Sequence, residues 1–148
     1  MKVENTTLEG VLILTPEEYQ DNRGLFKELF NSSELQNAGI SEGFVQDNFS
    51  RSKRHVLRGL HYQKTKPQGK LVTCLRGQVF DVVADVNPKS VTFGKYLGVE
   101  LSEQNGLQIW IPPGYAHGFC VLSDEADFFY KCSDFYNPSD EAGIIWND

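Results

Sequence analysis

Apolar and polar residues alternate most regularly between residues 78 and 86. There, Phe80, Val82, Ala84 and Val86 share one face, and Val79, Asp81, Val83 and Asp85 share the other. A period of two residues is typical of a β-strand. The run at 56–63 also has the composition of a strand, and further short strands between Gly and Pro turns are predicted at residues 71–75, 94–101, 107–111, 117–122, 127–133 and 143–146. The pattern predicts an all-β barrel or jelly roll.

Helix signals are confined to the first forty residues. Thr15, Pro16 and Glu18 have the order of an N-cap, a proline at the first helical position and a capping-box glutamate. Residues 33–36 form a second capping box, and Gly39 follows as a stop signal. We therefore expect one or two short N-terminal helices in a single all-β domain that spans residues 1–148.

Composition and charge narrow the possible functions. A formal net charge of −6 argues against sequence-independent binding of nucleic acid, which needs a basic face. No apolar stretch approaches the ~18 residues of a membrane span, and the N-terminus lacks the apolar core of a signal peptide. The three cysteines, Cys74, Cys120 and Cys132, are far apart, which favours buried free thiols over a disulfide framework. We expect a cytoplasmic protein that binds neither nucleic acid nor membrane.

Basic residues are concentrated in one segment of this acidic chain. No Asp or Glu interrupts residues 48–80, which hold eight of the fourteen Lys and Arg side chains, namely Arg51, Lys53, Arg54, Arg58, Lys64, Lys66, Lys70 and Arg76. Such a run is often only a solvated loop. The alternative is a surface that binds a small anion such as a phosphate or diphosphate.

One of the three histidines, His61, lies in the predicted strand at residues 56–63 together with Arg58. In a regular strand these two side chains, three positions apart, would point to opposite faces. Gly59 lies between them and is a candidate for a β-bulge that turns both to one face. His61 is then either a hydrogen-bonded core imidazole or a catalytic group.

A second histidine ends a recognisable motif. Residues 106–117 close with Pro112, Gly114 and His117 in the spacing P-x-G-x-x-H, which resembles the second sequence motif of cupins. The first cupin motif is incomplete, because Tyr62 and Gln63 follow His61 where a metal-binding cupin has H-x-H and then a glutamate. Two histidines are too few for a secure zinc or iron site, so no metal is expected.

These residues supply the groups for proton transfer next to a carbonyl. Histidine suits the role of general base, because the unperturbed pKa of this residue type, about 6.5, lies close to working pH, and His61 is the candidate. Lys70 can hold an enolate oxygen, Tyr130 can return a proton on the opposite face, and Asp81 can orient an imidazole. Each also has a structural alternative, with Tyr130 as a core or edge aromatic and Asp81 as a hydrogen-bonded barrel carboxylate.

Several blocks resemble the dTDP-4-dehydrorhamnose 3,5-epimerase family, in order from about residue 8 to the last residue. They are residues 21–28, 44–50, 56–63, 69–72, 79–82, 90–94, 111–119 and 136–138. The resemblance implies a metal-free cupin-type barrel without a cofactor, commonly a homodimer that exchanges N-terminal strands. It also implies epimerisation at C3 and C5 of a 4-keto-6-deoxy sugar carried on dTDP, a step towards rhamnose.

The resemblance also implies roles for individual residues. His61 matches the proton acceptor, Tyr130 the proton donor and Lys70 the group that steadies the enolate. His117 and Arg58 match contacts to the sugar or diphosphate, and Tyr136 matches an aromatic that stacks on thymine. The remaining substrate-binding positions are Arg23, Phe26, Glu28, Gln46, Asp47, Asn48 and Glu141.

The resemblance is incomplete at the C-terminus. Family members typically continue beyond the position of Asp148, and the continuation holds the aspartate that pairs with the catalytic histidine. Asp81 is expected to replace this partner of His61. Three alternatives to a double epimerase stay open: an epimerase acting at one carbon or on a related nucleotide sugar, a catalytically weakened nucleotide-sugar-binding cupin, and a metal-dependent cupin enzyme.

Overall fold

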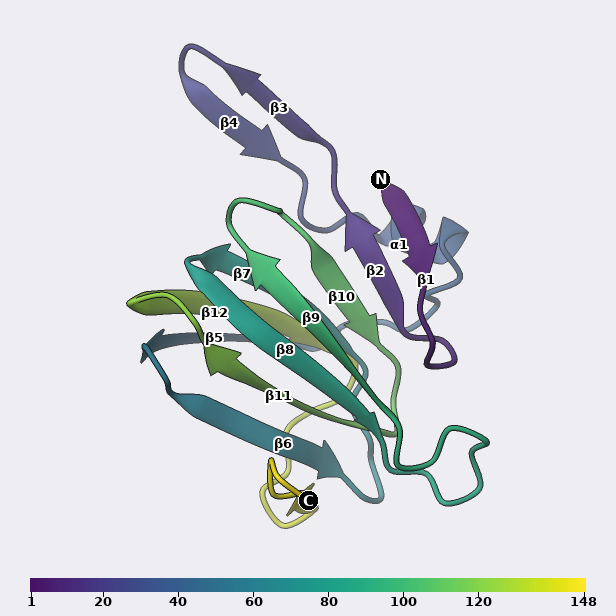
Figure 1. The fold of residues 1–148 in the computed structure, drawn as a ribbon. Helices are drawn as coiled ribbons and strands as arrows, with labels where there is room; N and C mark the ends of the chain where they lie inside the picture. The colour runs from purple at the N-terminus through teal and green to yellow at the C-terminus, as the bar shows by residue number, and fades with distance from the viewer.

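In a computed structural model that describes all 148 residues, the chain forms two antiparallel sheets and a projecting hairpin (Figure 1). The larger sheet has the strand order β1 (Lys2–Asn5), β2 (Leu12–Thr15), β10 (Gln108–Ile111), β7 (Lys70–Arg76), β12 (Glu125–Cys132) and β5 (Gln46–Lys53). The smaller sheet has the order β13 (Glu141–Gly143), β6 (Leu57–Gln63), β11 (Tyr115–Val121), β8 (Gln78–Asp85) and β9 (Tyr96–Ser102). The hairpin is made of β3 (Glu18–Asp21) and β4 (Gly24–Lys27). The prediction of an all-β fold is confirmed.

The main core lies between the two sheets. It joins apolar residues of both, including Val72 and Phe128 from the larger sheet and Val83, Leu101 and Val121 from the smaller one. On β8 the alternation read from the sequence is confirmed, because Val79, Asp81, Val83 and Asp85 are all buried. Two carboxylates therefore point inward among apolar side chains, an arrangement that requires a polar partner for each.

The helix prediction is confirmed at one of its two positions. Helix α1 (Ser32–Asn37) is capped by Asn31, whose side chain accepts hydrogen bonds from the backbone N–H groups of Ser33 and Glu34. Gly39 follows with φ of +87°, as expected for a helix stop. The helix packs over a second, smaller core that includes Leu35 and Trp110.

No helix forms at residues 15–18, so that prediction was wrong. Strand β2 ends at Thr15 and β3 begins at Glu18. Strand β2 pairs with both β1 and β10, and Leu14 is completely buried. Long-range pairing and burial outweigh a local capping signal worth only ~1 kcal/mol.

The strands predicted from residue 70 onward are confirmed, except for the last. Strand β13 occupies Glu141–Gly143, whereas the sequence pattern placed it at residues 143–146. Strands β1 to β5 were not predicted. The one helix has six residues, and no helix is long and apolar enough to cross a membrane.

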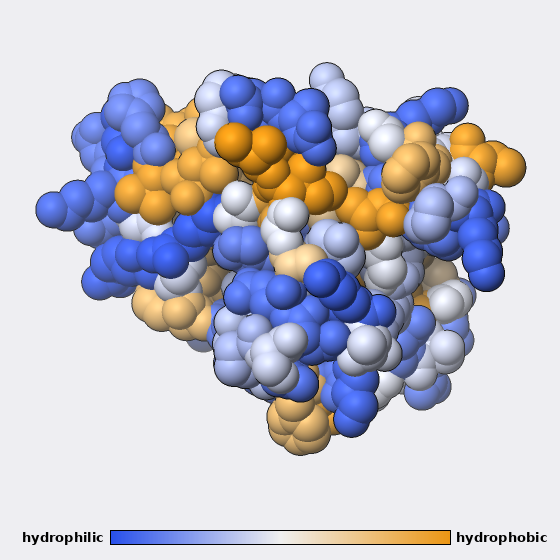
Figure 2. Space-filling model, turned by 90° about the horizontal axis from the view of Figure 1, so that it is seen from below, coloured by the Kyte–Doolittle hydropathy of each residue, from blue (hydrophilic) through white to orange (hydrophobic).

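Several apolar side chains remain at the surface. On the hairpin, Tyr19, Leu25 and Phe26 are each at least 60% exposed. Elsewhere Val91, Ile145 and Trp146 are also exposed. Figure 2 shows apolar residues gathered in a band across one mainly hydrophilic face. Cys74 and Cys132 are buried free thiols, and burial raises the pKa of Cys74 to about 11, whereas Cys120 is only half-buried.

Candidate active site

A β-bulge in β6 sets the geometry of the site. His61 pairs with His117, but Arg58 pairs with Phe119, so three steps along β6 oppose two along β11. Gly59 lies in this bulge with φ of +99°, and a Cβ there would collide with the backbone of His117 and Gly118. As a result, Arg58 and His61 line the same cavity. The bulge predicted at Gly59 is confirmed.

The cavity has a volume of about 480 Å³ and draws its walls from both sheets. This size is within the range of small-molecule sites. Its lining residues are Ser50, Leu57, Arg58, Gly59, His61, Lys70, His117, Gly118, Phe119, Phe128 and Tyr130. The structure therefore brings together five residues predicted from the sequence: Arg58, His61, Lys70, His117 and Tyr130.

His61 and Tyr130 approach the cavity from different sheets. His61 lies on β6 of the smaller sheet, and Tyr130 lies on β12 of the larger sheet. Lys70, on β7, places its Nζ 5.9 Å from the centroid of the Tyr130 ring. Burial lowers the pKa of Lys70 and raises the pKa of Tyr130. An imidazole, a phenol hydroxyl and an amine thus surround one space.

Asp81 does not pair with His61, which corrects the expectation drawn from the sequence. Its Oδ2 lies 2.8 Å from Nε2 of His117, and both side chains are buried. Asp81 stands opposite Phe119 in the β8–β11 register, one diagonal from His117 on the same face. Its second oxygen, Oδ1, has no hydrogen-bond partner. Asp81 therefore stands behind His117.

The carboxylate beside His61 belongs to Glu141. Its Oε1 lies 3.3 Å from Nδ1 of His61, and its Oε2 accepts a 2.8 Å hydrogen bond from the hydroxyl of Tyr136. This bond to a carboxylate raises the pKa of Tyr136. The backbone N–H of Tyr136 donates to Oε1 of Gln46 at 3.0 Å. Tyr136, Glu141 and Gln46, three predicted ligand positions, are therefore joined at the His61 side of the cavity.

The other predicted positions on β5 have partners of their own. The Asp47 carboxylate lies 2.8 Å from Nζ of Lys131. The side chain of Asn48 accepts from Gln46 and donates to Sγ of Cys132. Neither Asp47 nor Asn48 lines the cavity.

Five residues of the basic segment fall into two groups. Arg51 and Arg76 both bind Asp127, at 2.7 and 3.1 Å, and lower its pKa to about 2. Arg54 pairs with the exposed Asp124. These three arginines form ion pairs at the surface, as expected if this part of the basic segment is solvated and does not bind an anion. Arg58 and Lys70 instead face the cavity, where Nε of Arg58 donates to Oγ of the buried Ser52.

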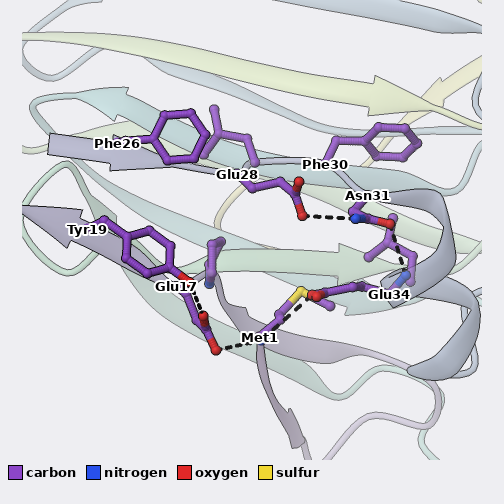
Figure 3. Close-up of a pocket in the computed structure, with 11 residues that line it drawn as sticks. Met1, Glu17, Tyr19, Phe26, Glu28, Phe30, Asn31 and Glu34 are labelled. Atoms are coloured by element: carbon purple, nitrogen blue, oxygen red, sulfur yellow. Dashed lines mark hydrogen bonds and ion pairs between the residues drawn. The ribbon is translucent and has the colours of Figure 1, made fainter.

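Arg23, Phe26 and Glu28 do not join His61 within one chain. Arg23 is 86% exposed on the hairpin, where it pairs with Asp21. Phe26 and Glu28 line a second cavity of about 270 Å³ near the N-terminus (Figure 3). There Glu28 accepts a hydrogen bond from Asn31. Within this single chain these three residues lie apart from His61, because the hairpin extends away from the two packed sheets (Figure 1). Their assignment to the substrate site stays a prediction.

Three residues that line the cavity beside His61, namely Phe119, Phe128 and Ser50, were not predicted from the sequence. The rings of Phe119 and Phe128 stack with centroids 3.9 Å apart, and Phe128 also stacks against His117. Ser50 contributes a buried hydroxyl without a hydrogen-bond partner. Aromatic residues in strands are usual core residues, so no sequence signal distinguishes these two. The structure contains no cluster of three or more His, Cys, Asp or Glu side chains that could hold a metal ion.

Comparisons with known proteins identify a family. A family model described as dTDP-4-dehydrorhamnose 3,5-epimerase matches residues 5–148. The protein of that name from Escherichia coli K12 is 53% identical over 150 residues, covering 100% of this chain and 81% of the relative. The one from Methanothermobacter thermautotrophicus is 50% identical over 143 residues, covering 97% of this chain and 77% of the relative.

A solved structure shows the same fold. It is the crystal structure of dTDP-6-deoxy-D-glucose-3,5-epimerase from Legionella pneumophila in complex with dTDP-4-keto-L-rhamnose, which matches with a TM-score of 0.96 at 51% identity. The match covers 98% of this chain and 78% of that one. The fold and these matches define a cupin-type isomerase. The chain belongs to the dTDP-4-dehydrorhamnose 3,5-epimerase family.

Proposed function

We propose that this protein epimerises dTDP-4-dehydro-6-deoxy-D-glucose at C3 and C5 to give dTDP-4-dehydro-L-rhamnose. The observation that carries the proposal is the placement of His61 and Tyr130 on opposite sheets around one cavity that also holds Lys70. Both C3 and C5 are adjacent to the C4 ketone, so each carbon can lose a proton to form an enolate. One acid–base pair can therefore serve both carbons in turn.

Each epimerisation is written as two proton transfers. The imidazole of His61 takes the proton from the carbon, and the electron pair of the C–H bond moves into the enolate with its charge on O4. The hydroxyl of Tyr130 then gives a proton to the same carbon from the opposite face, which inverts it. The Tyr130 phenolate then takes a proton from solvent, and the His61 imidazolium releases one to solvent.

Lys70 and His117 are proposed to stabilise the developing charge on O4. Lys70 is half-buried, and a cation in a poorly solvated cavity acts strongly on a nearby oxyanion. His117 is held from behind by Asp81, whose Oδ2 lies 2.8 Å from Nε2 of the imidazole. This arrangement supports a site prepared for an enolate before substrate enters.

The nucleotide part of the substrate is proposed to bind at the edges of the cavity. Arg58 provides a guanidinium for the diphosphate, which such groups bind in a bidentate manner. Half-exposed Tyr136 offers a ring on which thymine can stack. Gln46, Asp47 and Asn48 lie on β5, where Oε1 of Gln46 accepts a hydrogen bond from the backbone N–H of Tyr136, and they supply polar groups for the base and ribose.

We further propose a homodimer in the cytoplasm. The hairpin β3–β4 exposes Tyr19, Leu25 and Phe26, and an apolar surface of this kind is costly in a monomer. If the hairpin crosses to a second copy, Arg23, Phe26 and Glu28 reach the cavity of that copy. The resemblance to the family supports this exchange.

The proposed function is tested by incubating the protein with the 4-keto nucleotide sugar in deuterium oxide and following the sugar by NMR. Deuterium at both C3 and C5, together with the L-rhamno product, is the expected result. Deuterium at one carbon would replace the proposal with a single-position epimerase. No deuterium at either carbon would leave a nucleotide-sugar-binding protein.

A further inference from the structure

The carboxylate of Glu141 lies between two rings of the candidate site. One oxygen is 3.3 Å from Nδ1 of His61, and the other accepts the 2.8 Å hydrogen bond from Tyr136. Each oxygen thus has a protein partner. A carboxylate whose two oxygens are already engaged is better suited to holding a side chain in place than to binding a substrate hydroxyl.

Strand pairing explains why Glu141 can reach His61. In the β13–β6 register Glu141 stands opposite Gln63, and Gly143 stands opposite His61. Side chains of directly opposed residues share a face, so Glu141 is the diagonal neighbour of His61. Gly143 has no side chain to fill the space beside the imidazole, and its position lies against Cδ2 of that ring. The Glu141 side chain therefore crosses diagonally to Nδ1.

The segment that carries Glu141 is firmly attached. Oε1 of Gln63 accepts a 2.7 Å hydrogen bond from the backbone of Asn137. The buried Asp140 accepts hydrogen bonds from the backbone N–H groups of Thr65 and Lys66. Both anchors join residues 137–140 to β6 or to the turn that follows it. Glu141 is thus placed on a rigid support, as the control of a reactive side chain requires.

We propose that Glu141 is a positioning residue for His61. This role rests on the proposed function of His61 as the general base. Glu141 keeps the proton of the His61 ring on Nδ1. Nε2 is then left free to accept the proton of the substrate, and the imidazolium formed during turnover is stabilised. Tyr136 fixes the second oxygen of Glu141 and so keeps the carboxylate at this angle.

The test compares Glu141→Ala and Glu141→Gln with wild type, using Glu9→Gln as a control that removes a charge from an exposed glutamate outside the cavity. Three quantities are measured: the nitrogen-15 shifts of the His61 ring, the rate of deuterium exchange at saturating substrate, and the affinity for dTDP. The ring shifts are recorded on resting protein, so they report the tautomer even if no turnover occurs.

In wild type the Nδ1–H tautomer is expected to dominate. Glu141→Ala should move His61 towards the Nε2–H tautomer and lower the saturated exchange rate ~10²-fold. Its affinity for dTDP should stay within about threefold. Glu141→Gln, which keeps an oxygen for Nδ1–H but loses the charge, should retain more of the tautomer preference than alanine does. Glu9→Gln should match wild type in all three measurements.

Two results would overturn the inference. One is an unchanged His61 tautomer in Glu141→Ala. The other is a loss of at least about tenfold in dTDP affinity with an unchanged saturated rate, which would make Glu141 a substrate-binding residue only. If wild type itself shows no exchange, the proposed function fails, and the tautomer comparison still decides whether Glu141 controls the His61 ring.

Discussion

Arg58 and His61 line the same cavity although three positions of one strand separate them. The bulge at Gly59 shifts the strand register by one residue and so brings the Arg58 guanidinium to the cavity that also holds the proposed base. A regular strand would have sent one of the two side chains away from the cavity. The local backbone of β6 is therefore part of the site.

Gly59→Ala should damage both stability and activity. Gly59 has a positive φ, which an alanine adopts only with strain, and the added Cβ would collide with the backbone of β11. We therefore expect a loss of roughly 3 kcal/mol or more in the free energy of unfolding. Gly24→Ala is the matched control, because Gly24 has φ of +128° but open space around it. The control should lose only about 1–2 kcal/mol in chemical denaturation. Equal losses in the two variants would show that the contact with β11 is unimportant.

Asp81 and His117 should be strongly coupled in stability. Removing one partner of a buried pair leaves an uncompensated polar group, so His117→Ala should cost about 3–5 kcal/mol. In the double variant Asp81→Ala, His117→Ala the loss should be smaller than the sum of the single losses by at least about 1 kcal/mol. The exposed pair Arg54 and Asp124 serves as the control and should show a coupling below about 1 kcal/mol. Additive losses at Asp81 and His117 would contradict the pairing.

Asp127 should make the fold sensitive to acid. Arg51 and Arg76 lower its pKa from 3.8 to about 2 in the folded protein. Because the folded carboxyl binds its proton less readily than the unfolded one, its contribution is complete above about pH 4 and is lost as the pH falls towards 2. Asp127→Asn should be less stable than wild type at pH 7, and the difference should shrink as the pH falls through about 2 and disappear below it. A constant difference across this range of denaturation measurements would rule out Asp127 as the titrating group.

Tyr130→Phe should separate proton removal from inversion. The variant keeps the ring beside Lys70 but loses the hydroxyl proposed to reprotonate the carbon. Deuterium wash-in should therefore fall less than formation of the inverted product, which should drop ~10²-fold or more. The two rates are compared by NMR on the same sample. Equal losses in both rates would remove Tyr130 from the role of acid.

Elements of this structure that depend on local interactions could be predicted from the sequence, and those that depend on long-range strand pairing could not. The alternation around Asp81 and the capping signal near Ser33 are local, and both lead to the observed elements. The signal at Thr15 is equally local but fails, because Leu14 is fixed in a strand by partners more than ninety residues away on β10. Pairing of this kind cannot be read from a short window.

The same limit applies to the site. His61, Lys70, His117 and Tyr130 were found because each fits a chemical role, and the structure gathers them around one cavity. Which carboxylate serves which histidine depends on strand register. Asp81 is diagonal to His117 on β8 and β11, whereas Glu141 is diagonal to His61 on β13, a strand that the sequence pattern placed two residues too late.

The most direct test of the account is the rate of deuterium exchange into the nucleotide sugar by His61→Asn and by His55→Asn. His61 lines the cavity, whereas His55 lies outside it in a turn with φ of +67°, a conformation that asparagine tolerates. We predict that His61→Asn loses at least ~10²-fold in exchange at C3 and C5, and that His55→Asn keeps the wild-type rate. Exchange by His61→Asn at a near wild-type rate would contradict the central claim that His61 removes the proton.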